Sequence, residues 1–162
     1  MIKNIILFLI FLILPNFSLA CDKEDFLKYV SAEKNRCIAL QTIGEINKNK
    51  KNLIIFLHGD LSSGAKPPGK KGYWKLGNEL LSKNVNFFFL ARPGYTLDSG
   101  RKSYGSYKET RKAKTNYKWE KLELVAKAAQ NLKEYYNADN LIMIGHSGGA
   151  FTSATINSRV PK

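Results

Sequence analysis

The clearest candidate chemistry in this 162-residue sequence lies in a glycine-rich stretch near its carboxyl end, Gly145-His146-Ser147-Gly148-Gly149. The stretch fits Gly-x-Ser-x-Gly, a pattern that places serine at a very sharp turn between a strand and a helix. Glycines two residues before and after leave room for the crossing chain, and the strained turn exposes the serine oxygen. Such a serine can attack an ester or amide carbonyl, so Ser147 is the candidate nucleophile.

The sequence around this stretch favours that interpretation over a glycine-rich turn without chemistry. An apolar run over residues 141–144 predicts a buried strand directly before it, and the small residues after Gly149 can begin a helix. Strand, turn and helix in that order are the context in which the pattern carries a nucleophile.

Attack on a carbonyl creates an oxyanion, which backbone N–H groups stabilise when they point at the developing charge. Gly148, the residue after the candidate nucleophile, offers one such group at a helix N-terminus, where the helix dipole favours negative charge. The second candidate is the backbone N–H of Asp60, or of Leu61, after a buried strand that ends in His58-Gly59-Asp60. We expect His58 to pin this loop by hydrogen bonds and not to act as the base.

Three continuous apolar runs, at 53–57, 85–91 and 141–144, predict strands buried on both faces. Apolar residues at 3–4 spacing predict helices over 73–83 and 119–136. Helical spacing also occurs in 22–35, and a short apolar alternation follows over 37–46. Strands that alternate with helices predict a parallel sheet with flanking helices, with function at the carboxyl ends of the strands.

Together these residues resemble the α/β-hydrolase superfamily. In that family a His-Gly pair ends one strand, as His58-Gly59 does, a loop similar to Arg92-Pro93-Gly94-Tyr95 ends the next, and a serine elbow follows the next helix and strand. The resemblance covers residues 51–161. It implies a serine hydrolase of esterase, lipase or peptidase type, acting on a small ester or peptide substrate without a cofactor. It also implies an incomplete α/β-hydrolase fold over residues 21–162, ending just after the nucleophile elbow.

The sequence departs from the family pattern after Ser147. The chemistry needs a base and a carboxylate that orients it, which follow the serine as Asp or Glu and then His. Residues 148–162 contain no Asp, Glu or His. Besides His58 the chain has only His146, and neighbouring residues at an elbow point in different directions. We therefore expect no triad acid or histidine in this chain, and a truncated or split hydrolase that is inactive alone.

Residues 1–20 have the pattern of a secretory signal peptide, which predicts a periplasmic or secreted protein. Lys3 precedes an apolar run over 5–14, and Ser18-Leu19-Ala20 ends the segment. The run is shorter than the roughly 20 residues that a membrane-spanning helix needs. A buried N-terminal strand or helix is the less favoured alternative.

Cys21, at the expected new N-terminus, has two possible uses. It can form a disulfide with Cys37, the only other cysteine, in an oxidising compartment. It can instead carry a lipid that anchors the protein to a membrane. Lipoprotein signals usually place Leu three residues and a small residue two residues before the cysteine, and Ser18 and Leu19 reverse that order. The disulfide is favoured.

The formal net charge of +13 comes mostly from lysines scattered along the chain, which predicts a solvated surface and no nucleic-acid partner. Basic and aromatic residues alternate most densely over 95–119. As an alternative function, this loop could bind an anionic polymer or membrane surface without catalysis.

Two further site types are not expected. The segment Gly64–Lys71 matches seven positions of a phosphate-binding loop, but Lys71 stands where Ser or Thr would hold magnesium. Two prolines also remove backbone N–H groups that such a loop needs. No Cys, His, Asp and Glu have metal-ligand spacing, so we predict no metal.

Overall fold

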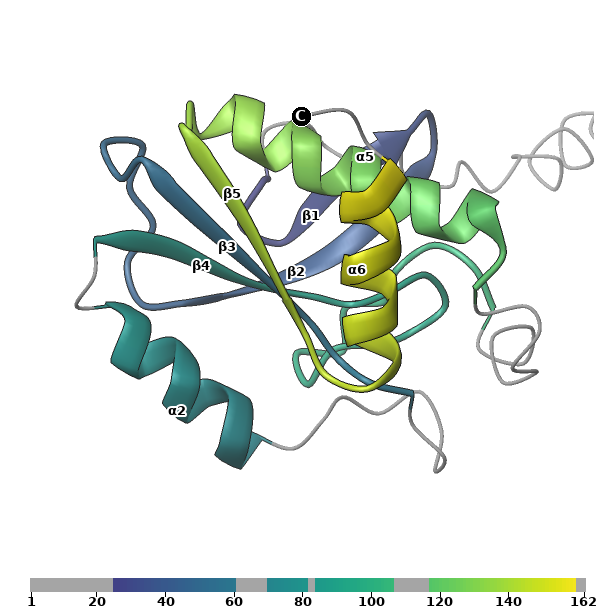
Figure 1. Ribbon diagram of the computed structural model, residues 1–162, viewed down its shortest axis with the longest axis horizontal. Helices are drawn as coiled ribbons and strands as arrows, with labels where there is room; N and C mark the ends of the chain where they lie inside the picture. Colours follow the sequence, from purple (N-terminus) through teal and green to yellow (C-terminus); the bar gives the residue numbers. More distant parts are fainter. Residues whose placement is uncertain (1–24, 61–69, 82–83, 107–116, 160–162) are drawn as a thin grey trace, which may run out of the picture.

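The computed structural model describes residues 25–60, 70–81, 84–106 and 117–159 (Figure 1). These contain, in chain order, the elements β1 (Tyr29–Glu33), β2 (Arg36–Ile43), β3 (Asn52–Leu57), α2 (Lys70–Leu81), β4 (Val85–Leu90), α5 (Trp119–Tyr135), β5 (Asn140–Gly145) and α6 (Gly148–Arg159). The predicted signal peptide, and residues 64–69 of the segment that resembles a phosphate-binding loop, lie outside the described residues.

The five strands form one sheet in the order β1-β2-β4-β3-β5. β3 lies between β4 and β5 and pairs with both in parallel. β2 pairs antiparallel with β1 on one side and with β4 on the other. The predicted fold class, an incomplete α/β-hydrolase fold with a parallel sheet and flanking helices, is therefore wrong, because the sheet is mixed.

The antiparallel part comes from residues 22–35, where the sequence suggested a helix, and from residues 37–46, where it showed a short apolar alternation. Residues 29–43 instead form a hairpin whose two-residue turn ends at Asn35, with φ of 63°. Asparagine tolerates this left-handed conformation better than most residues, and such turns suit antiparallel strands. Burial along β1 alternates, with Val30 and Ala32 inside. A period of two is typical of a strand. The 3–4 spacing of apolar residues in this segment therefore wrongly indicated a helix.

The core lies on both faces of the sheet. α5 and α6 lie on one face and α2 on the other (Figure 1). Side chains of β3 alternate between the two faces: Leu53, Ile55 and Leu57 pack with the α5 side, while Ile54 and Phe56 pack with the α2 side. Every residue of β4 is buried. The expectation that these two strands are buried on both faces is confirmed.

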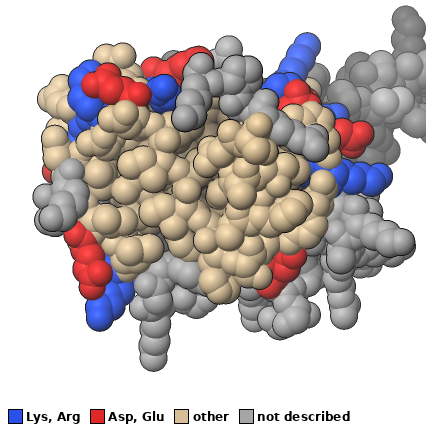
Figure 2. Space-filling view, in the orientation of Figure 1, with Lys and Arg blue, Asp and Glu red and all other residues tan. Residues whose placement is uncertain are grey.

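β5 is the edge of the sheet within the described residues, because β3 is its only neighbour there. Its outer position leaves Ile142 43% exposed, in contrast to the buried side chains of β3 and β4. The prediction that the strand at residues 141–144 is buried on both faces is therefore wrong. The middle of the surface around α6 and β5 carries no charged side chains (Figure 2). None of the helices described is long and apolar enough to span a membrane.

Candidate functional site

Ser147 stands at the sharp turn between β5 and α6. Its backbone has φ of 51°, and the residue is exposed. The N–H of His146 donates to the carbonyl of Leu57 at 3.0 Å, which ties the turn to the end of β3. The N–H groups of Ala150 and Phe151 donate to the carbonyl of Ser147 at 2.9 and 3.1 Å, so α6 begins at once.

Two glycines make this turn sterically possible. A methyl group on Gly145 would overlap the backbone of Gly149, and one on Gly149 would overlap the carbonyl of Leu57. The backbone of β5, of β3 and of the first turn of α6 therefore touch without side chains between them. This close approach is the reason for the glycines two residues before and after Ser147.

The two predicted oxyanion residues lie beside each other. A Cβ on Gly148 would come within 2.9 Å of Oδ2 of Asp60, and one on Gly59 would lie 3.0 Å from the Cβ of Ser147. The end of β3 therefore meets the start of α6 around the serine. The role of the Gly148 and Asp60 backbone N–H groups stays a prediction, because these contacts are made by the Asp60 carboxylate.

That carboxylate is the centre of a polar cluster that the sequence did not reveal. It accepts hydrogen bonds from the Arg92 guanidinium, from the Tyr117 hydroxyl and, at 3.2 Å, from the Tyr95 hydroxyl. The Arg92 side chain is 4% exposed, whereas that of Asp60 is 39% exposed. A signal for the ion pair did exist: Asp60 and Arg92 follow β3 and β4, parallel neighbours whose carboxyl ends lie side by side.

The pKa shifts in this cluster determine which of its groups carry a proton. Burial tends to raise the pKa of Asp60, but hydrogen bonds from Tyr117 and Arg92 outweigh it and lower that pKa. Burial raises the pKa of Tyr117, and its hydrogen bond to Asp60 raises it further. Asp60 is therefore a carboxylate, Tyr117 a hydroxyl donor, and neither is suited to accept a proton from Ser147.

His58 is buried and uses both ring nitrogens. The N–H of Arg92 donates to Nε2 at 3.2 Å, so Nδ1 carries the proton and donates to the carbonyl of Gly59 at 2.7 Å. Burial, helped by the Arg92 charge, lowers the pKa of His58 to about 4. The expectation that this histidine pins the loop by hydrogen bonds is confirmed, whereas its exclusion as the base stays a prediction.

The lowered pKa of His58 predicts a loss of stability in mild acid. A histidine in the unfolded chain has a pKa of about 6.5. Below pH 6.5 His58 therefore binds a proton in the unfolded chain, whereas in the folded chain it stays neutral until the pH approaches 4. The stabilisation is complete above pH 6.5 and is lost as the pH falls toward 4. Between pH 7 and pH 5 we expect His58 to account for a fall of about 2 kcal/mol in the free energy of unfolding. Urea titrations at both pH values measure it, and His58→Gln should remove this part of the slope. An equal slope in both proteins would contradict the assignment.

Other predicted features are only partly within the described residues. Cys37 is disulfide-bonded, but Cys21 lies outside those residues, so their pairing stays a prediction. In the loop 95–119, residues 107–116 also lie outside. Of the rest, Tyr95 is buried and Arg101 donates to the carbonyl of Leu40 at 2.9 Å. Among described residues no cluster of three or more Cys, His, Asp or Glu could hold a metal ion.

The described site therefore combines an exposed serine in a strained turn, a helix that begins directly after it, and the Asp60 carboxylate, which binds the buried Arg92 guanidinium. His146, the residue before the serine, is exposed, and its Nδ1 would lie 3.0 Å from a Cβ on Gly59. No family model, curated protein or solved structure matches the chain.

Proposed function

We propose that this protein is a serine hydrolase of ester or amide bonds, related to the α/β-hydrolase superfamily, with Ser147 as its nucleophile. The observation that carries the proposal is the backbone of Ser147. The other non-glycine residues with positive φ in the described part of the chain are all asparagines, Asn35, Asn84 and Asn137. Serine lacks their tolerance, and strain of this kind concentrates at active sites.

The neighbourhood of Ser147 supports this role. When Oγ attacks a carbonyl carbon, the carbonyl oxygen becomes an oxyanion that the N–H of Gly148 can receive at the start of the 12-residue α6. Three hydrogen-bond donors, from Arg92, Tyr95 and Tyr117, hold the nearby Asp60 carboxylate. These donors reduce the electrostatic repulsion between the Asp60 carboxylate and the oxyanion.

The residues that the structure describes supply no evident base for Ser147. Residues 148–162 contain no Asp, Glu or His. His58 has both nitrogens engaged, and the pKa of Asp60 is lowered. A positioned base contributes about 10²–10⁴-fold to such reactions. We propose that this chain alone is inactive or nearly so, with Ser147 placed correctly and not activated.

We expect a fluorophosphonate probe to label Ser147 slowly at pH 7, and faster at higher pH. Mass spectrometry of the digested protein locates the adduct, which should disappear in Ser147→Ala. Ser158→Ala is the matched control, since Ser158 is an exposed serine on the same helix, and it should leave labelling unchanged. An adduct spread evenly over several serines would refute the nucleophile.

The accompanying proposals are export, as a periplasmic or secreted protein or a lipid-anchored one, and a small ester or peptide as substrate. A binding function for the loop 95–119 is less favoured. Tyr95 and Arg101 are directed to partners within the protein and are not available to a surface.

A further inference from the structure

Two aromatic side chains, Tyr117 and Phe151, lie beside the first turn of α6 and form what we call the aromatic pair. The N–H of Phe151 donates to the carbonyl of Ser147 at 3.1 Å, one helical turn earlier. The hydroxyl of Tyr117 lies against Gly148, where an added Cβ would overlap it. The two rings meet edge to face, with centroids 4.8 Å apart and planes at 71°. The aromatic pair therefore borders the candidate nucleophile.

The polar cluster holds the aromatic pair in place. The Tyr117 hydroxyl donates to the Asp60 carboxylate, which the buried Arg92 guanidinium also binds. Asp60 comes shortly after the end of β3, so these contacts anchor the Tyr117 ring to the sheet. An anchored ring loses little conformational freedom when a ligand packs on it, which favours binding. The cluster thus gives the aromatic pair a fixed position before any substrate arrives.

Phe151 leaves about half of its surface to solvent. It is 54% exposed, the largest exposed fraction among the large apolar side chains that the structure describes. The middle of the surface around α6 and β5 carries no charged side chains (Figure 2). Single exposed apolar residues are common, but Phe151 packs on an anchored ring next to a strained serine. An apolar group of a ligand that covered this ring would be removed from water at a net gain.

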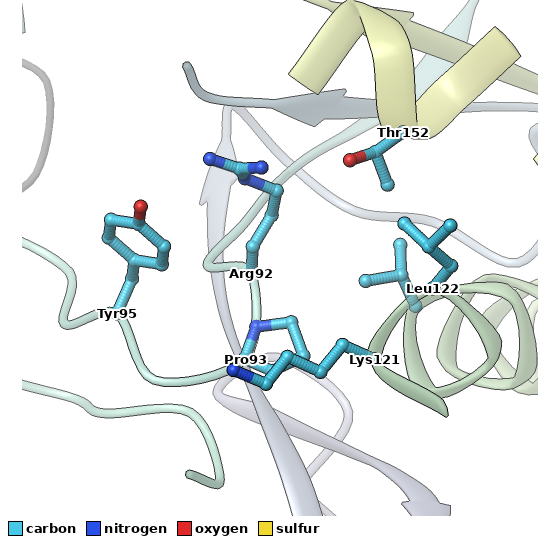
Figure 3. Close-up of a pocket in the computed structure, with 7 residues that line it drawn as sticks. Arg92, Pro93, Tyr95, Lys121, Leu122 and Thr152 are labelled. Carbon is cyan, nitrogen blue, oxygen red and sulfur yellow. The ribbon is translucent and has the colours of Figure 1, made fainter. Parts of the chain in front are cut away.

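The cavity behind the polar cluster cannot take such a group. It lies between the loop after β4 and the helices α5 and α6, and its volume of about 10 Å³ admits one water molecule. Figure 3 shows Arg92 and Thr152 at this cavity. Thr152 is buried and donates to the carbonyl of Gly148 at 2.9 Å, whereas its neighbour Phe151 is exposed. An apolar group attached at Ser147 therefore has the aromatic pair, and not this cavity, to pack against.

We propose that the aromatic pair binds the acyl part of the substrate, so that the substrates are esters or amides with an apolar acyl group. This inference rests on the proposed function of Ser147. When Oγ bonds to the carbonyl carbon, the bond from that carbon to the leaving oxygen or nitrogen breaks, and the leaving group departs with the serine proton. The acyl group stays bonded to Oγ and packs on Phe151. Phe151 contacts the substrate, and Tyr117 is a positioning residue.

Two sulfonyl fluorides test this preference, because they differ only in the group that stands for the acyl part. Phenylmethanesulfonyl fluoride carries a benzyl group where methanesulfonyl fluoride carries a methyl group. In both reactions Oγ bonds to sulfur, fluoride leaves and the serine proton passes to water. Mass spectrometry at pH 9 gives the rate of Ser147 modification by each reagent. The measured quantity is the ratio of the benzyl rate to the methyl rate.

Variants of the aromatic pair should change this ratio, and the intrinsic reactivities of the reagents cancel when variants are compared. Phe151→Ala should lower the ratio about tenfold through the loss of one aromatic contact. Phe151→Tyr keeps the ring and should keep the ratio. Tyr117→Phe keeps the second ring but removes its anchor, and should lower the ratio about threefold.

Ile142→Ala is the matched control. Ile142 is also an exposed apolar side chain, but it pairs in register with Ile54, whose side chain packs on the α2 side of the sheet. It therefore lies on the face opposite α6, and its loss should leave the ratio unchanged. An equal ratio in the wild-type protein and Phe151→Ala, with Ser147 modified in both, would refute the acyl site and leave the proposed function standing. If neither reagent modifies Ser147 in the wild-type protein, the proposed function fails and this inference fails with it.

Discussion

Replacing Gly149 with alanine is expected to lower the free energy of unfolding by about 4 kcal/mol, a large share of the roughly 5–15 kcal/mol that stabilises an ordinary domain. The added methyl group would overlap the carbonyls of Leu57 and His58. Leu57 is the last residue of β3 and His58 follows it directly, and β3 is paired on both sides and cannot move alone. Urea unfolding followed by circular dichroism measures the change.

Gly100→Ala is the matched control for Gly149→Ala. Gly100 has φ of 80°, and nothing lies within 4 Å of the position of an added Cβ. Only backbone strain should therefore appear, at about 1 kcal/mol. Equal costs at the two glycines would show that the overlap at Gly149 is relieved by movement, and that the packing around Ser147 is looser than described.

Removing the charge of Asp60 is the second large effect. In Asp60→Asn the buried Arg92 guanidinium loses its carboxylate partner, and we expect a loss of about 3 kcal/mol in the free energy of unfolding. The value lies at the low end for buried pairs because the Asp60 side chain is 39% exposed. The same urea titration at pH 7 measures it.

The control is Asp25→Asn, which breaks an exposed ion pair between Asp25 and Lys28. That change should cost less than about 1 kcal/mol. The pH dependence adds a second check. Because the pKa of Asp60 is lowered in the folded state, its stabilisation is present above the unfolded pKa near 4 and is lost as the pH falls further. A wild-type loss below pH 4 that persists unchanged in Asp60→Asn would contradict the role given to this carboxylate.

Several elements followed from local sequence. The continuous apolar runs predicted β3, β4 and β5 to within a residue or two, and the 3–4 spacing predicted α5. The hairpin of β1 and β2 was not predicted, because Tyr29 and Val30 fit both a helical face and a strand. The decisive feature was the left-handed turn at Asn35. Because this turn was not recognised from the sequence, a parallel sheet was predicted where the structure has a mixed one.

The candidate site, too, was predicted only in part from the sequence. The spacing of Gly145, Ser147 and Gly149 reported the turn correctly, since the steric requirement is local. The hydrogen bond of Tyr117 to Asp60 joins residues 57 positions apart, and no periodicity encodes such a contact. The Arg92–Asp60 pair could have been predicted from the sequence, because opposite charges at the carboxyl ends of neighbouring strands lie close once the strand order is known.

The most direct test of the central claim is the pH dependence of fluorophosphonate labelling at Ser147. A serine without a general base reacts through its small alkoxide fraction, so the labelling rate should rise about tenfold per pH unit from pH 6 to 9 without a plateau. Labelling should remain specific to Ser147 throughout this range. Rapid labelling at pH 7 with a plateau above it would show a working base within this chain, and would contradict the proposal that Ser147 is positioned but not activated.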